Sequence, residues 1–154
     1  MKILKNKGIV TLPTIMIMGM MALAIVVSIT AISFNELLIS QSSNQSTKAL
    51  FYAESGIRDA LLKIVRNKNY TCSTADCYMI DFISNGCSNN TDCAVVTVSP
   101  GLGTTNDPKI IISKGIMMSS VRTIKVDVIL DEGSTSPNIQ NGEITSIFWS
   151  ELIE

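Results

Sequence analysis

The stretch Ile9 to Phe34, IVTLPTIMIMGMMALAIVVSITAISF, decides the fold because it is almost wholly apolar and contains no ionisable side chain. The next charged residue is Glu36. A helix of about 20 apolar residues is enough to cross the hydrocarbon core of a bilayer, so this stretch can span a membrane. The basic residues that precede it, with no acid among them, are Lys2, Lys5 and Lys7. Their charge favours a cytoplasmic N-terminus and export of everything after Phe34.

A cleaved secretory signal is the competing interpretation of this stretch. Its apolar region usually has about 7–15 residues, followed by a small-residue cleavage site. Here the small-residue candidates, Ala22–Ala24 and Ala31–Ser33, lie inside the apolar run or at its end. A membrane helix that stays on the protein fits the sequence better.

Composition narrows the classes of function. The chain has 154 residues, a formal net charge of −1 and no histidine. A nucleic-acid-binding protein would show a basic surplus. Histidine is the commonest general base and a common metal ligand. We therefore expect neither an enzyme nor a metal or other cofactor.

The four cysteines occupy one short part of the predicted exported region: Cys72, Cys77, Cys87 and Cys93. No C-x-x-C pair occurs, so the usual zinc spacing is missing. Cysteines in an oxidising compartment favour disulfides. Of the three possible connectivities we prefer Cys72 with Cys77 and Cys87 with Cys93, because short loops close most readily, although the sequence alone leaves the other two open.

Lys7-Gly8-Ile9, with a basic leader before it and the apolar run after it, resembles the type III signal of type IV prepilins. The resemblance implies cleavage by the prepilin peptidase between Gly8 and Ile9, and N-methylation of Ile9. Residues 1–8 would be a cytoplasmic leader and residues 9–35 a helix that serves as membrane anchor and filament core. The implied partners are other pilin subunits, the prepilin peptidase, an inner-membrane platform protein and an assembly ATPase.

Two residues depart from the common pilin pattern. Ile9 stands where phenylalanine is more usual, and Pro13 stands at the fifth mature position, where most pilins carry glutamate. That glutamate is thought to neutralise the N-terminal amine of a neighbouring subunit, and proline cannot do so. Proline is tolerated in the first turn of a helix, so Pro13 also fits a simple helix start.

The helical pattern continues from residue 36 to residue 68. Apolar residues recur at helical spacing, namely Ala49, Ala53, Ile57, Ala60, Leu61 and Ile64. We predict one helix from about Pro13 to Lys68, whose apolar half is followed by an amphipathic half. The polar segment Gln41–Thr47 is its weakest part. We interpret it as a solvated juxtamembrane segment, and a bend or frayed turn there is the alternative.

Tyr52-Ala-Glu-Ser-Gly-Ile57 with Ala60 resembles a second pattern, found just after the membrane helix in PilX-like and related minor pilins. There the run packs the exported half of the helix against a sheet. Gly56 costs a helix about 1 kcal/mol relative to alanine, which favours a role in close approach of the sheet. Glu54 is a candidate assembly contact or a simple exposed helix pair.

Beyond residue 68 the periodicity becomes that of strands. β-rich or alternating runs predict strands at Ala94–Ser99, Lys109–Ser113, Val121–Leu130 and Ile144–Ile153, the last with Trp149 as a core or edge residue. Lys114-Gly115 is expected to begin a turn, and Asp131–Gly142 is expected to be a polar loop. The fold class is thus α+β: a long N-terminal helix packed on a small antiparallel sheet, with residues 69–154 as an exported β-rich head that carries the disulfides.

These features predict a structural subunit of a type IV pilus-like filament, a minor pilin at or near the tip. It would enter the membrane as a single-pass protein and leave it as part of an extracellular filament. A type II secretion pseudopilin shares the same physical features. An uncleaved single-pass anchor that displays a small binding domain is the alternative from another class.

Overall fold

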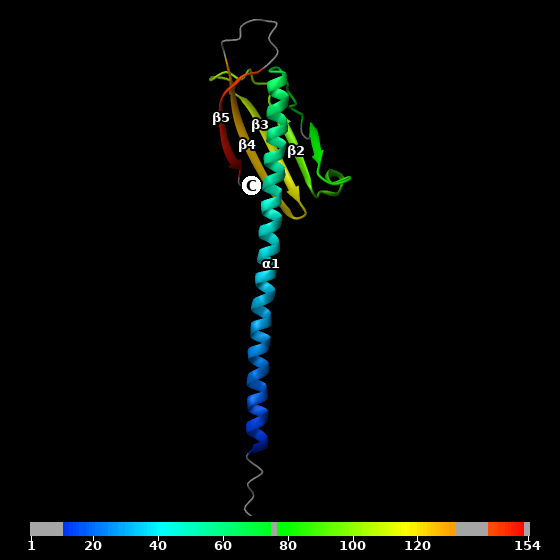
Figure 1. Ribbon diagram of the computed structural model, residues 1–154, viewed down its shortest axis with the longest axis vertical. Helices are drawn as coiled ribbons and strands as arrows, with labels where there is room; N and C mark the ends of the chain where they lie inside the picture. The colour runs from blue at the N-terminus through cyan, green and yellow to red at the C-terminus, as the bar shows by residue number, and fades with distance from the viewer. Residues whose placement is uncertain (1–10, 75–76, 132–141, 153–154) are drawn as a thin grey trace, which may run out of the picture. The chain divides into compact units, whose positions relative to one another are not determined.

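The computed structural model describes residues 11–74, 77–131 and 142–152, and the chain divides into two compact units, Met1–Gln41 and Ser42–Glu154. One helix, α1 (Thr11–Arg66), is followed by a five-stranded antiparallel sheet (Figure 1). The strands are β1 (Tyr78–Asp81), β2 (Cys93–Val98), β3 (Lys109–Met117), β4 (Ser120–Leu130) and β5 (Ile144–Leu152), with a short 3₁₀ helix, η1 (Cys87–Asn89), between β1 and β2. The predicted α+β class is confirmed.

Helix α1 runs without a break through Gln41–Thr47, the polar segment where the sequence left a bend or frayed turn as the alternative. Two contacts support the continuous helix. The Thr47 hydroxyl donates to the carbonyl of Ser43 at 2.9 Å, and the Gln45 side-chain amide approaches Sδ of Met118 at 3.4 Å in the β3–β4 turn. The polar segment is therefore held by its own backbone and by the tip of a hairpin.

At its other end α1 stops at Arg66, two residues before the predicted Lys68. The Asn67 amide still donates to the carbonyl of Lys63 at 2.9 Å, and the Tyr70 amide then donates to the carbonyl of Asn67 at 2.8 Å. The chain thus turns at once toward the sheet.

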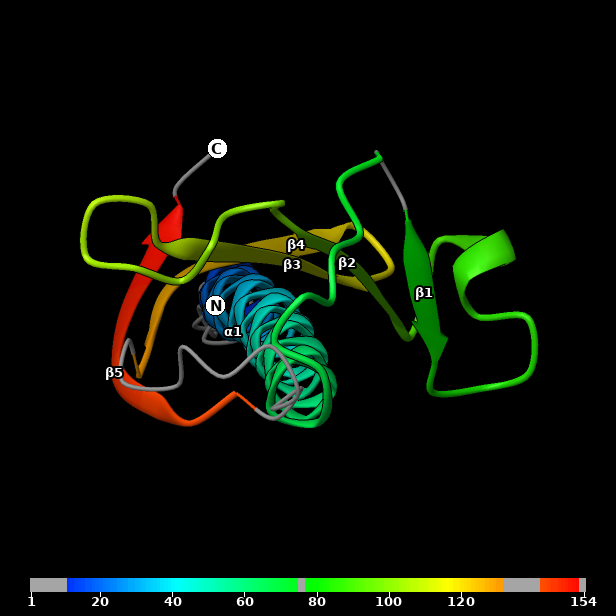
Figure 2. The same cartoon turned by 90° about the horizontal axis from the view of Figure 1, so that it is seen from above.

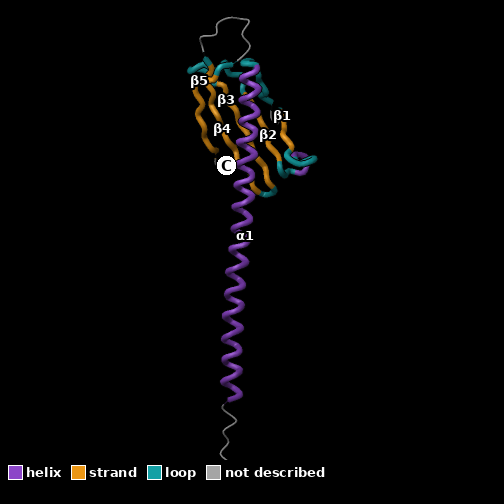
Figure 3. The backbone as a smooth tube through the Cα atoms, viewed as in Figure 1, coloured by secondary structure: helices purple, strands orange, loops and turns teal. Residues whose placement is uncertain are grey.

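The sheet is a meander in which each strand pairs with the next, so its order is β1-β2-β3-β4-β5 (Figure 3). Seen along the helix, the part of α1 within the second unit lies on one face, across the middle strands, while β1 and β5 form the two edges (Figure 2). The predicted apolar helix stripe faces this sheet. The core between them is made by Ala53, Ile57, Ala60, Ile64, Cys72, Val96, Val98, Ile111, Ile124, Val126, Val128 and Leu130, all buried.

One strand prediction was wrong, and one strand was not predicted. β3 continues to Met117 through the expected turn at Lys114-Gly115, and the chain reverses only at Met118 and Ser119. Gly115 marks a close approach to α1 rather than a turn. β1 was not predicted at all, because its four residues lie among turn-forming residues within the cysteine-rich segment, residues 72–93.

The remaining strands begin and end within two residues of their predicted limits, although Ile153 lies outside the described residues. Most of the predicted polar loop Asp131–Gly142 also lies outside them, since residues 132–141 are not described. Trp149 lies on the edge strand β5 and is 49% exposed.

Candidate functional site

The apolar half of α1 exposes nearly all of its large side chains. From Pro13 to Asn35 the described residues include no acid or base, and the exposed side chains include Ile15, Met16, Met18, Met20, Leu23, Ile25, Val27, Ile29, Ile32 and Phe34. This one helix is long and apolar enough to cross a membrane. In a monomeric soluble protein an apolar surface of this size would be unusual, and it marks a membrane or an interaction site.

Three hydroxyl groups in this segment bond to their own helix. Ser28, Thr30 and Ser33 donate to the carbonyls four residues earlier at 2.8, 2.8 and 3.1 Å. In hydrocarbon an unpaired hydroxyl would be costly. These bonds therefore make the segment compatible with lipid or with neighbouring apolar helices.

Among the residues that the sequence singled out, Gly8 and Ile9 lie outside the described residues. Pro13 lies in the first turn of α1, which begins at Thr11, where proline leaves no intrahelical donor missing. The first acidic residue of α1 is Glu36, and it is exposed. The start of the described helix therefore presents no carboxylate.

Gly56 of α1 and Gly115 of β3 lie where the helix and the sheet approach each other closely. A Cβ atom added at Gly56 would lie 2.3 Å from Oγ of Ser113 and 2.8 Å from Cγ2 of Val96. One added at Gly115 would lie 1.9 Å from the carbonyl oxygen of Ala49. Each element thus carries a glycine where the other approaches, as the sequence suggested for Gly56. Gly115, which from the sequence alone indicates a turn, lies inside strand β3.

Glu54 lies on the surface of α1. Its carboxylate is 3.7 Å from the guanidinium of Arg58, and the two side chains are 39% and 75% exposed. Such pairs contribute little to stability. The structure therefore leaves Glu54 accessible without giving it a partner beyond its own helix among the described residues.

The four cysteines form two bridges, Cys72–Cys77 and Cys87–Cys93, which is the pairing preferred from loop length. The carboxylate of Asp81 accepts a hydrogen bond from the Cys87 amide at 2.6 Å and lies near the second bridge. Because both sulfur atoms are bonded to each other, they cannot serve as thiolate metal ligands. Asp81 and the Cys87–Cys93 disulfide therefore stabilise the β1–β2 connection.

The β1–β2 connection also contacts α1. The Tyr52 hydroxyl donates to the carboxylate of Asp92, and its ring stacks on Phe82 at 4.3 Å between centroids. The hydrogen bond to Asp92, followed by burial, raises the pKa of Tyr52 to about 12. Sequence reasoning missed this contact because Tyr52 and Asp92 are 40 residues apart.

Lys63 holds the edge strand β1 to the helix. Its ammonium group lies 3.0 Å from the carboxylate of Asp59 and 3.4 Å from the centroid of the Tyr78 ring. Cation–π contacts of this kind are attractive. Burial, and then the charge of Asp59, raises the pKa of Tyr78. Tyr52 and Lys63 therefore attach the cysteine-rich segment to α1 at two points.

Comparison with protein-family models, with curated proteins and with solved structures found no match. The arrangement itself, a long apolar N-terminal helix packed on an antiparallel sheet, is the one that the resemblance to type IV pilins implied. The candidate functional site is accordingly the exposed apolar half of α1.

Proposed function

We propose that this protein is a structural subunit of a type IV pilus-like filament, and specifically a minor pilin. The observation that carries the proposal is the continuity of α1: one helix joins an uncharged, exposed apolar half to a half that docks on a sheet through Gly56. Lys7-Gly8-Ile9 lies just before that helix. The combination supplies a processing signal, an anchor and a head.

The proposed work is mechanical. The apolar half partitions from the bilayer into the core of a filament, where it exchanges lipid contacts for the helices of neighbouring subunits. Removal of residues 1–8 by a prepilin peptidase takes away the three lysines of the leader. Because these charges oppose withdrawal from the cytoplasmic face, their removal frees the helix to move outward, driven by the platform protein and assembly ATPase.

Pro13 supports a position at or near the tip. A later subunit brings a positively charged amine beneath older subunits, and a buried unpaired charge is costly. This protein has no acid at position 13, and its first acid, Glu36, lies about 35 Å from Pro13 along a helix that rises ~1.5 Å per residue. A subunit at the tip is not part of a repeating array of identical copies. It therefore does not need to neutralise the N-terminal amine of another copy of itself.

Processing can be tested at Gly8. Gly8→Leu should block cleavage, since by analogy with the family the peptidase accepts only a small residue there. Gly19→Leu is the matched control because nothing lies within 4 Å of an added Cβ at Gly19. Cleavage of both variants at the wild-type rate would contradict the assigned site and favour an uncleaved anchor.

The tip position has its own test. An epitope tag inserted between Asp131 and Gly142 should be labelled by immunogold at filament ends and at low copy number. Uniform labelling along the shaft would contradict the tip position and leave the pilin proposal intact. Absence of the tag from purified filaments would contradict both.

A further inference from the structure

Strand β5 is one edge of the sheet. It has nine residues and pairs with β4 alone among the described residues. Native proteins usually protect such edges with lysine, proline or a very short strand. Over Ile144–Leu152 there is no lysine and no proline, and Glu151 is the one charged residue. The opposite edge, β1, has only four residues.

The sequence of β5 is symmetric in polarity about Phe148. The run Thr145-Ser-Ile-Phe-Trp-Ser-Glu151 has three apolar residues at its centre and two polar residues on each side. In an antiparallel pair of two such strands centred on Phe148, Ile147 of each copy lies opposite Trp149 of the other. Ser146 lies opposite Ser150, and Phe148 lies opposite itself. Every residue of the run therefore meets one of its own polarity.

The faces of the sheet agree with this pairing. Ile147 and Trp149 lie opposite Val128 and Val126 of β4 and so share the face that carries α1, while Phe148 points to the other face. In such a pair these side chains meet those of the second copy on the same face. Phe148 is 61% exposed and Trp149 is 49% exposed, so both have surface left to bury.

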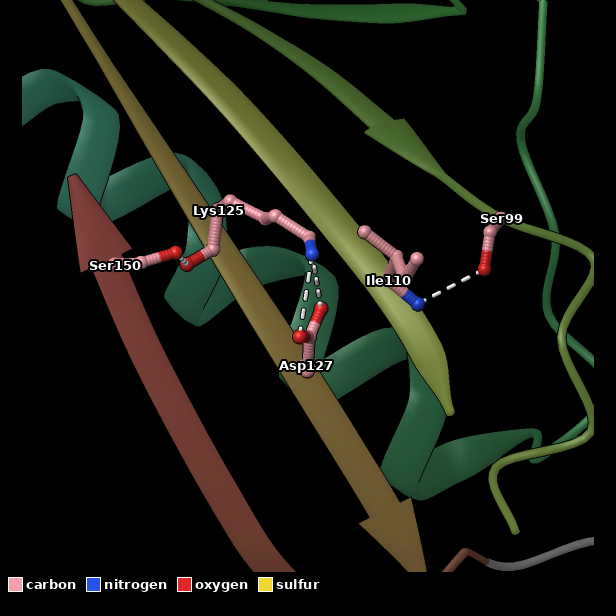
Figure 4. Close-up of polar contacts among 5 residues, drawn as sticks. All are labelled: Ser99, Ile110, Lys125, Asp127 and Ser150. Atoms are coloured by element: carbon pink, nitrogen blue, oxygen red, sulfur yellow. Dashed lines mark hydrogen bonds and ion pairs between the residues drawn. The ribbon is translucent and has the colours of Figure 1, made fainter. Parts of the chain in front are cut away.

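The charges near β5 do not oppose self-pairing. Glu151 is 3.1 Å from Arg122 on β4. Lys125 is 3.2 Å from Asp127, also on β4 (Figure 4), and Asp127 is the residue paired with Phe148. Like charges directly opposite one another destabilise a strand pair. Here each copy presents neutralised pairs, and Glu151 would lie opposite Thr145 rather than opposite its own twin.

We propose that β5 pairs antiparallel with β5 of a second copy of this chain, which joins the two sheets edge to edge across a twofold axis at Phe148. Because residues 42–66 of α1 run along the strands (Figure 1), those helix segments run in opposite directions in the pair. The proposed contact therefore differs from side-by-side packing of heads whose helix segments run in the same direction.

The pair should be weak. A buried aromatic side chain covers ~200 Å², so the exposed parts of Phe148 and Trp149 amount to about 200 Å² in each copy and about 400 Å² in the pair. Main-chain pairing adds to this, but the total stays below the ~1,200 Å² of a stable interface. The expected association is reversible, and covalent trapping is the appropriate assay.

Single cysteines test the register in the full chain in detergent. None of the four native cysteines is free, so an introduced cysteine is the reactive thiol. Phe148→Cys should form a disulfide dimer on mild oxidation, and a mixture of Ser146→Cys and Ser150→Cys should form a heterodimer. Ser146→Cys alone should not cross-link, because its twin lies four residues away along the strand, about 13 Å at ~3.3 Å per residue, beyond the reach of a disulfide. Leu102→Cys, exposed and remote in sequence, is the control.

A charge exchange tests the twofold axis independently. Phe148→Lys, placed in both the Ser146→Cys chain and the Ser150→Cys chain, should lower heterodimer cross-linking at least tenfold, and so should Phe148→Glu. Combining Phe148→Lys in one chain with Phe148→Glu in the other should restore cross-linking. Leu102→Lys should leave it unchanged. Cross-linking of Phe148→Cys no faster than Leu102→Cys, or equal self-linking at positions 146 and 148, would overturn the proposal.

Discussion

Replacing Gly115 by alanine measures how closely α1 and the sheet approach. The added Cβ would lie 1.9 Å from the carbonyl oxygen of Ala49 and 2.6 Å from the amide nitrogen of Ala53. Both are main-chain atoms, so no side-chain rotation relieves the overlap. Gly115 does not have a positive φ, so alanine fits its backbone conformation and the whole effect comes from the contact.

The overlap determines how much unfolding free energy Gly115→Ala is expected to lose. An ordinary contact needs about 3.4 Å, so the helix must move by more than 1 Å or the strand must bend. Overpacking a core costs about 1–3 kcal/mol, and the main-chain contacts place Gly115→Ala at or above the upper end. A loss of about 3 kcal/mol lowers the midpoint of thermal unfolding of a domain of this size by roughly 10 °C.

The fluorescence of Trp149, the one tryptophan of the chain, reports unfolding of the head in detergent. Gly19→Ala is the control, since its Cβ meets nothing within 4 Å. Gly56→Ala should be intermediate: its Cβ meets side chains, and alanine recovers about 1 kcal/mol of helix propensity. A loss below about 1 kcal/mol for Gly115→Ala would refute the close contact.

Three further predictions concern the head. Because Asp92 and burial raise the pKa of Tyr52 to about 12, its contribution to stability should be full below pH 10 and decline as pH rises toward 12; Tyr52→Phe should remove this part of the alkaline loss, as measured by urea unfolding at several pH values. Replacing Cys72 and Cys77 together by alanine should lower the free energy of unfolding by about 2 kcal/mol, and the native protein should take up no thiol reagent unless it is reduced. Ser113→Ala should be neutral or stabilising by up to about 1 kcal/mol in the same urea assay, since the Ser113 hydroxyl is buried without a hydrogen-bond partner among the described residues and an unsatisfied buried hydroxyl is costly.

The sequence predicted the elements whose signals are local and long. The uncharged run and the stripe from Ala49 to Ile64 indicated α1, and alternation indicated β4. Signals that depend on packing were misread or missed. Gly115 reads as a turn residue unless the nearby main chain of Ala49 is known, and β1 is too short to show a period.

The contacts that attach the cysteine-rich segment had no usable sequence signal. Tyr52 and Asp92, or Lys63 and Tyr78, are polar or aromatic residues whose partners are set by how the chain folds back. The polar segment at Gln45 looked weak because its partner, Met118, lies in a distant hairpin. The exposed apolar half of α1, in contrast, needed only composition and length.

The central claim, that the chain is a processed pilin-like subunit, is tested most directly by the mass of its N-terminal peptide after extraction from membranes of cells that contain a prepilin peptidase. The expected peptide begins at Ile9, with or without an added methyl group. An intact N-terminus at Met1 or Lys2 would contradict it.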